Sequence, residues 1–345
     1  MTRTIEAFAV FHRQKEILAD YTQVASAALA LLRRNIDVPD APEMLGAMVD
    51  ACGVKHWGKG KRYNRAIEKV DSGRAALANQ GVIQQAAAFD FFSRNLLLDV
   101  MRFSPGARAT MQLIKHDHRL LMLSPQRRWV VSHCCNDVVS NLGALSSRLD
   151  DLKSWIGWAP SEKLTPTLPL FDLLRRIRNR IAHDDAMIGS DLEEFSGGSE
   201  VRDAVRAFQT NYARGEAPSL PVFERGKRLQ LEPVNAIFFG AFLYEIAKEL
   251  NAHATGLLDD GGFIDMAFFY SMVVDEHPFR TKRHRSAEAR INYFLIERYL
   301  RGDGNPGAQA IIQRLNNETL IAERPSKLTS TAWRVALDRH AQLLS

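Results

Sequence analysis

The sequence predicts a mainly α-helical protein, and the spacing of its apolar residues is the main reason. Over the first thirty-odd residues, apolar side chains recur at steps of three or four from Ile5 to Leu32, which keeps them near one face of a helix. The same spacing predicts helices over about 83–103, from Pro125 to Leu152, and over about 234–250. The sequence shows no fixed-period repeat, so a solenoid is not indicated.

Two further helices and a C-terminal group complete the helical prediction. Prolines precede a strongly patterned helix expected over about 170–188, and a shorter helix is expected over about 201–212. Asp259 to Gly262 is expected to break the chain, because paired glycines interrupt helices. From Phe263 onward, the pattern predicts three or four more helices, interrupted by a glycine-rich stretch at 302–307.

One stretch, about 220–231, departs from the helical pattern. Val222-Phe223 and Leu229-Gln230-Leu231 flank Gly226 there. Short apolar runs on either side of a glycine are typical of a strand–turn–strand unit. The sequence therefore predicts one β-hairpin.

These elements group into three expected segments. Residues 1–79 form an N-terminal helical extension with a glycine-rich basic loop, residues 80–258 a helical domain, and residues 259–345 a C-terminal helical domain. A chain of 345 residues is long enough for such a division.

The composition indicates a folded protein without a membrane span. Hydrophobic residues make up 46% and charged residues 25%, which is ordinary for a globular protein, and no apolar run reaches membrane length. The start of the chain lacks a signal-peptide core, so we expect a cytoplasmic protein. The three cysteines suggest neither a disulfide framework nor a zinc clip. We expect no metal or other cofactor.

The most informative segment is the helix expected from Leu170. Its apolar residues Leu170, Leu173, Leu174, Ile177 and Ile181 form one stripe. The other side carries four arginines, an asparagine and a histidine: Arg175, Arg176, Arg178, Arg180, Asn179 and His183. Asn179 and His183 are four residues apart and share a face.

These residue types suit phosphate chemistry. A histidine near neutral pKa can take or give a proton, and an arginine fork matches the charge on a phosphorus centre under attack. RNA supplies its own nucleophile, the 2′-hydroxyl. His183 would then move the proton, Arg178 would hold the phosphate, and Asn179 would orient a phosphate oxygen or the imidazole.

Arg178 and His183 do not converge within one helix. Five residues separate them, which corresponds to about 140° around an ideal helix. Two copies packed antiparallel across a two-fold axis could line one groove with both arginines and both histidines. We therefore expect a homodimer.

Arg178-Asn179-x-x-x-His183, late in an amphipathic helix, resembles the Arg-x4–6-His motif of the HEPN superfamily. The resemblance implies that 80–258 is a HEPN-like helical bundle with helical N- and C-terminal extensions, which dimerises through the motif helices. It also implies a metal-independent endoribonuclease that leaves a 2′,3′-cyclic phosphate. Such proteins often act in toxin, RNA-processing or antiviral systems, with an antitoxin or defence-system protein as partner. Position 185 is aspartate, where one toxin branch has a modified tyrosine, so that regulation is not indicated.

Further cations are candidates for RNA contact. Arg175 and Arg180 flank the motif, and Lys59, Lys61 and Arg62 lie in a loop with two aromatic residues, a combination suited to phosphates and bases. The net charge of +5 is modest, so any RNA surface must be a local patch.

Three alternatives stay open at this point. A basic face opposite an apolar stripe is also typical of a solvated helix surface. The fold could serve as a non-catalytic interaction module, in which these arginines and the histidine are engaged in salt bridges or packing. A DNA-binding regulator would instead use the C-terminal helices, away from residue 183.

Overall fold

The fold is known from a computed structural model that describes residues 3–53, 63–104, 106–107, 145–183, 185–212, 220–273 and 287–299. The prediction of a mainly α-helical protein is confirmed within these ranges, and no helix there has the length and apolar character of a membrane span. The α-helices are α1 (Glu6–Asn35), α2 (Ala41–Ala51), α3 (Ala66–Phe103), α6 (Arg148–Ile156), α7 (Pro169–His183), α8 (Ser190–Gly197), α9 (Ser199–Asn211), α10 (Pro233–Leu257), α11 (Asp260–Phe268) and α12 (Ala287–Tyr293). The 3-10 turns are η3 (Leu145–Ser147) and η4 (Thr165–Thr167), and the π-helical turns are η5 (Phe269–Val273) and η6 (Phe294–Arg298).

The chain forms two compact units that differ from the three expected segments. Unit 1 contains Met1–His12, Asp90–Pro160 and Ile246–Ser345, and unit 2 contains Arg13–Phe89 and Ser161–Glu245. The expected boundary at residue 79 falls inside α3, and the one at 258 follows directly after α10. Helices α1, α3 and α10 each contribute residues to both units. Each of these three long helices therefore belongs partly to one unit and partly to the other.

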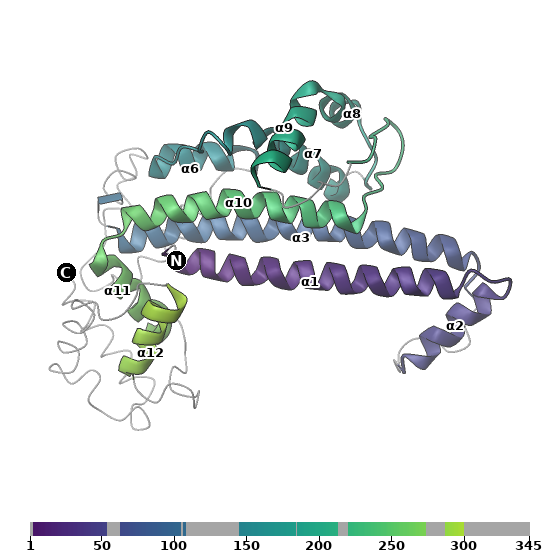
Figure 1. Cartoon of the computed structure of the whole chain (residues 1–345), viewed down its shortest axis with the longest axis horizontal. Coiled ribbons are helices and arrows are strands. Elements are labelled where there is room, and N and C mark those ends of the chain that lie inside the picture. The colour runs from purple at the N-terminus through teal and green to yellow at the C-terminus, as the bar shows by residue number, and fades with distance from the viewer. Residues whose placement is uncertain are drawn as a thin grey trace. The chain divides into compact units, whose positions relative to one another are not determined.

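In unit 2, the segments of α1, α3 and α10 lie side by side (Figure 1). A Cβ on Gly81 of α3 would lie 2.9 Å from the Cβ of Ala236 on α10 and 3.7 Å from the hydroxyl oxygen of Thr22 on α1. A Cβ on Gly240 of α10 would lie 2.8 Å from the side chain of Gln85 on α3. These glycines let the three helices approach more closely than larger residues would allow.

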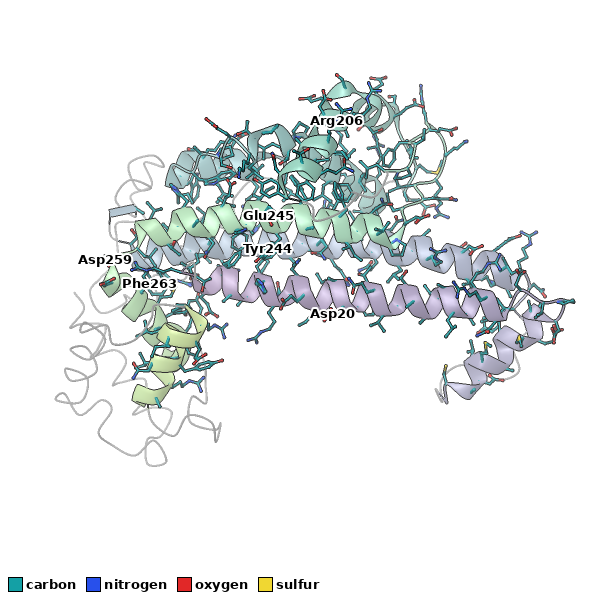
Figure 2. All side chains as sticks on the ribbon, viewed as in Figure 1. Asp20, Arg206, Tyr244, Glu245, Asp259 and Phe263 are labelled. Atoms are coloured by element: carbon teal, nitrogen blue, oxygen red, sulfur yellow. The ribbon has the colours of Figure 1, made fainter. Side chains whose placement is uncertain are left out.

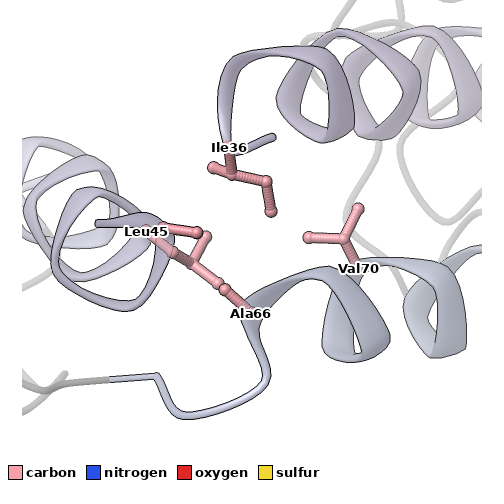
Figure 3. Close-up of a cluster of buried hydrophobic side chains, with 5 residues drawn as sticks. Ile36, Leu45, Ala66 and Val70 are labelled. Carbon is pink, nitrogen blue, oxygen red and sulfur yellow. The ribbon is translucent and has the colours of Figure 1, made fainter. Parts of the chain in front are cut away.

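The turn from α1 through α2 to α3 closes around a small apolar cluster (Figure 3). Its buried members are Ile36, Ala41, Leu45, Ala66 and Val70. They come from the segment after α1, from α2 and from the start of α3, so burying them together fixes the direction in which α3 returns. The sequence pattern missed this first part of α3 because its buried positions are mostly small residues.

Helices α7 and α9 cover the side of α3 and α10 that faces away from α1 (Figure 1). The ring of Phe171 on α7 lies 5.6 Å from that of Phe89 on α3. On α9, the ring of Phe208 lies 5.3 Å from Phe238 and 5.9 Å from Phe242, both on α10. Edge-to-face contacts of this kind add to the apolar burial that holds the layer in place.

The hairpin predicted over 220–231 is wrong. This stretch contains no strand, and its one β-bridge joins Arg228 to Met187, outside the predicted hairpin. The backbone N–H of Leu229 donates to the carbonyl oxygen of Ala186 at 2.7 Å, and that of Ile188 donates to Lys227 at 3.0 Å. The backbone groups that a hairpin would pair internally are thus used to hold the segment after α7.

The expected break at 259–262 is shorter than predicted. Helix α10 ends at Leu257 and α11 begins at Asp260. The side chain of Asp259 accepts a hydrogen bond from the backbone N–H of Gly262 at 2.7 Å, which satisfies a donor in the first turn of α11. The capping carboxylate therefore lets the two glycines lie inside a helix.

Unit 1 contains a buried polar network around Asp99 and Glu6. Asp99 accepts hydrogen bonds from the hydroxyl of Tyr270 at 2.5 Å and from the backbone N–H of Ala7 at 3.1 Å. Glu6 forms an ion pair with Arg298 and accepts a hydrogen bond from the Tyr299 hydroxyl at 3.0 Å. These contacts join the start of α1 to α3, η5 and η6.

The pKa of Asp99 is raised to about 7, mainly by burial and further by nearby Glu6, although Arg102 and the Tyr270 hydrogen bond each lower it. An unfolded aspartate has a pKa of about 3.9. Between these two values, the folded state holds a proton that the unfolded state releases, so stability falls as pH rises through this window.

We expect Asp99→Asn to remove much of this pH dependence, because asparagine does not titrate. The melting temperature of the wild type should fall between pH 5 and pH 8, and the melting temperature of Asp99→Asn should fall less. Asp203→Asn, at an exposed position of α9, serves as the control and should follow the wild type. Parallel profiles for the wild type and Asp99→Asn would contradict the assignment.

Candidate functional site

Helix α7 carries the candidate site and has the amphipathic form predicted from the sequence. Leu170, Leu173, Leu174 and Ile177 are buried, while the arginines and Asn179 are half-buried. Proline begins the helix at position 169, where its missing N–H has no helical partner to lose.

The end of α7 differs from the prediction, since the helix stops at His183 rather than near residue 188. Asp185 and Ala186 adopt left-handed backbone conformations, with φ of 50° and 61°. The N–H of Ala186 donates to the carbonyl oxygen of Arg180 at 2.9 Å, which closes the helix in the way a glycine usually does. Without a glycine in the sequence, the stop signal was missed.

Three of the four arginines on α7 are held by two carboxylates. Asp172 accepts hydrogen bonds from Arg175 at 2.5 and 2.8 Å and from Arg176 at 2.9 Å. Asp191, at the start of α8, lies 3.5 Å from Arg176 and also pairs with Arg180. Partial burial would raise the pKa of Asp172, but the hydrogen bonds from Arg176 and Arg175 outweigh it and lower that pKa. Arg175 and Arg176 therefore form ion pairs within α7, and Arg176 and Arg180 form ion pairs that link α7 to α8.

The remaining arginine, Arg178, is placed differently. Its Nη1 donates a hydrogen bond to the side-chain oxygen of Asn179 at 3.1 Å, and no carboxylate in the described part of the chain pairs with it. His183 is exposed at the last position of α7. Among the described residues, its ring makes no hydrogen bond. The structure thus brings Arg178 and Asn179 together and leaves His183 open.

The sequence also predicted RNA contacts outside the Arg178–His183 motif. Two of these residues, Arg175 and Arg180, lie on the same helix as the motif, and each forms an ion pair with a carboxylate. Lys59, Lys61 and Arg62 lie outside the described residues.

A hollow of about 430 Å³ lies beside the segment that follows α7. It is lined by Ile188, Pro221, Val222, Phe223, Lys227, Arg228 and Gln230. Arg228 forms an ion pair with Asp185, two residues beyond His183. Sequence reasoning missed this feature, because its two sides come from segments about forty residues apart and no motif marks either of them.

The fold places the chain in the class of mainly α-helical proteins, and among the described residues no cluster of three or more histidine, cysteine or acidic side chains could hold a metal ion. No family model, curated protein or solved structure matches the chain. The case for a function therefore depends on the residues of α7 themselves.

Proposed function

We propose that this protein is a metal-independent endoribonuclease of the HEPN type, acting as a toxin or antiphage effector, with Arg178, Asn179 and His183 as its catalytic residues. The observation that supports it is that the arginines of α7 differ in their partners. Arg175, Arg176 and Arg180 have carboxylate partners, whereas among the described residues Arg178 pairs with the amide of Asn179 alone and His183 is exposed. A helix whose cations served only structure would be expected to pair Arg178 as well.

The reaction uses only groups that these residues and RNA supply. A histidine removes the proton from the 2′-hydroxyl, and the 2′-oxygen attacks the adjacent phosphorus. The bond to the 5′-oxygen breaks, and that oxygen takes a proton from a second acid. Arg178 stabilises the additional negative charge on the phosphate oxygens. The products are a 2′,3′-cyclic phosphate and a 5′-hydroxyl.

The site is proposed to form between two copies. In a continuous α7, five residues separate Arg178 from His183, so the two side chains leave opposite flanks of the helix. Two antiparallel α7 helices would supply one histidine as base and the other as acid across the same groove.

The competing function is a non-catalytic interaction module. The ion pairs of Arg175, Arg176 and Arg180 favour it, since they use half of the polar residues of the motif face for structure. The two functions predict different effects of replacing Arg178 and His183, because only the enzyme needs these two side chains.

Purified protein is expected to cleave mixed RNA to the same extent with and without EDTA, because the nucleophile belongs to the RNA. End-group analysis should find cyclic phosphates. DNA and 2′-O-methylated RNA of the same sequence serve as controls and should remain intact. Inhibition by EDTA would contradict metal independence, and cleavage of the 2′-O-methylated strand would contradict attack by the 2′-hydroxyl.

A further inference from the structure

Helix α1 presents an apolar stripe that the described part of the protein leaves uncovered. Ile17, Tyr21, Val24 and Leu31 are 60%, 57%, 70% and 61% exposed, and Ala28, between the last two, is also exposed. Isolated exposed apolar residues are ordinary, but a contiguous row of them marks an interaction surface.

The stripe follows the seven-residue repeat of coiled coils, whose positions are lettered a to g. The steps from Ile17 are four, three, four and three residues. Positions of type a are therefore occupied by Tyr21 and Ala28, and positions of type d by Ile17, Val24 and Leu31. This alternation keeps a row facing one partner helix along its whole length. The stripe is therefore suited to pairing with another helix.

Two charged residues lie beside the apolar stripe of α1. Asp20 and Arg34 both occupy g positions, and both are exposed. Neither has an ion-pair partner among the described residues. Asp20 projects from the side of α1 away from α3 and α10 (Figure 2).

We propose that this face of α1 pairs antiparallel with α1 of a second copy of the chain, about a two-fold axis near Ser26. In this register, Tyr21 lies opposite Leu31 of the second copy and Val24 opposite Ala28. Asp20 then lies beside Arg34 of the second copy, and the symmetry forms this ion pair twice.

The charges select this register over its neighbours. Moving the helices by one heptad brings Arg34 opposite Arg13, and like charges oppose each other there. A parallel pairing leaves both Asp20 and Arg34 without an opposite charge, since the e position facing Asp20 is Ala25 and the one facing Arg34 lies beyond the end of α1. Only the register centred near Ser26 satisfies both charges.

This interface is distinct from the one proposed for the catalytic groove. In unit 2, α1 lies on one side of α3 and α10, and α7 lies on the other (Figure 1). A pair of chains joined through α1 would hold its two α7 helices apart. The chain thus has a second self-associating surface, whether or not α7 cleaves RNA.

Sedimentation velocity on the full chain tests the pairing. The α1 faces are expected to pair in the micromolar range, because two heptads bury less than the roughly 800 Å² per partner of a standard interface. Together with pairing through α7, this should give assemblies larger than a dimer, whereas α7 pairing without α1 pairing gives a dimer that Val24→Glu leaves unchanged. Val24→Glu should weaken this association at least about tenfold by placing a charge in the seam twice. Arg206→Glu, at an exposed position of α9, is the control and should change nothing.

A charge exchange tests the register. Asp20→Arg and Arg34→Asp should each weaken the dimer by several-fold, because each creates like-charged neighbours across the axis. The double variant Asp20→Arg/Arg34→Asp should restore wild-type affinity. Thermal melts of every variant should match the wild type, since the substituted side chains are exposed.

Three outcomes would overturn the proposal. A wild-type monomer whose thermal midpoint drops with Val24→Glu would mean that another part of the same chain covers the stripe. A dimer that tolerates Val24→Glu would place the association elsewhere. A double variant that stays as weak as its parents would rule out the antiparallel register.

Discussion

Replacing His183 by alanine is expected to reduce RNA cleavage by on the order of 10²–10⁴, the usual effect of losing general acid–base assistance. The thermal midpoint should stay close to that of the wild type. His183 is exposed and ends α7 without a hydrogen bond in the described structure, so its side chain adds little to folding. A gel assay on RNA, with thermal melts of the same samples, measures both effects.

Arg178 provides the matched comparison on the same helix. Arg178→Ala should lose cleavage to a similar extent without unfolding, and Arg178→Lys should recover little because lysine lacks the planar fork. Arg176→Ala is the structural control. Its guanidinium contacts Asp172 and Asp191 and lies 4.5 Å over the ring of Phe195, so we expect a lower thermal midpoint. Full cleavage by His183→Ala would rule out its catalytic role, and a large drop in its melting temperature would favour a structural role.

Gly262→Ala is expected to lower the stability of unit 1 strongly for so conservative a substitution. A Cβ at this position of α11 would lie 2.2 Å from the backbone carbonyl oxygen of Phe103, the last residue of α3. A backbone atom does not move aside as a side chain does, so α11 would have to shift. Overpacking of this kind costs about 1–3 kcal/mol, and more where the neighbours are rigid. Chemical denaturation measures this cost.

Its neighbour Gly261 gives a matched control. Among the described residues, a Cβ there meets the Asp259 carboxylate alone, at 3.4 Å, an ordinary contact. Gly261→Ala should therefore stabilise α11 by about 0.5–1 kcal/mol, because alanine loses less chain entropy in a helix. Equal effects of the two substitutions would show that the approach of α11 to Phe103 is not tight.

The sequence predicted helices well where large apolar residues recur at helical spacing. This holds for α1, for α10 and for the buried stripe of α7. It predicted poorly where small residues carry the packing, as in the first part of α3, where Ala66 and Ala78 are buried. It also failed at 220–231, because a run of apolar residues does not reveal whether its backbone pairs internally or with a segment forty residues earlier.

The candidate site was predictable in composition but not in its division of roles. The spacing of four arginines on one helix does not show which of them is engaged. Asp172, three and four residues before Arg175 and Arg176, is a local signal that could have been used. Asp191 could not have been found this way, since it reaches Arg176 and Arg180 from α8.

The ion pair between Arg180 of α7 and Asp191 of α8 also affects which anions could bind to α7. A Cβ on Gly189 would lie 2.6 Å from Nη2 of Arg180 and 2.7 Å from Oδ1 of Asp191, so a larger residue there would push these two side chains out of their present positions. Any phosphate that approaches Arg180 must compete with a carboxylate already in place. A single phosphate competes with it alone, whereas neighbouring phosphates of one strand gain from several cations at once. If α7 contacts RNA as proposed, these carboxylates should weaken the binding of small anions more than the binding of a strand that meets several cations at once.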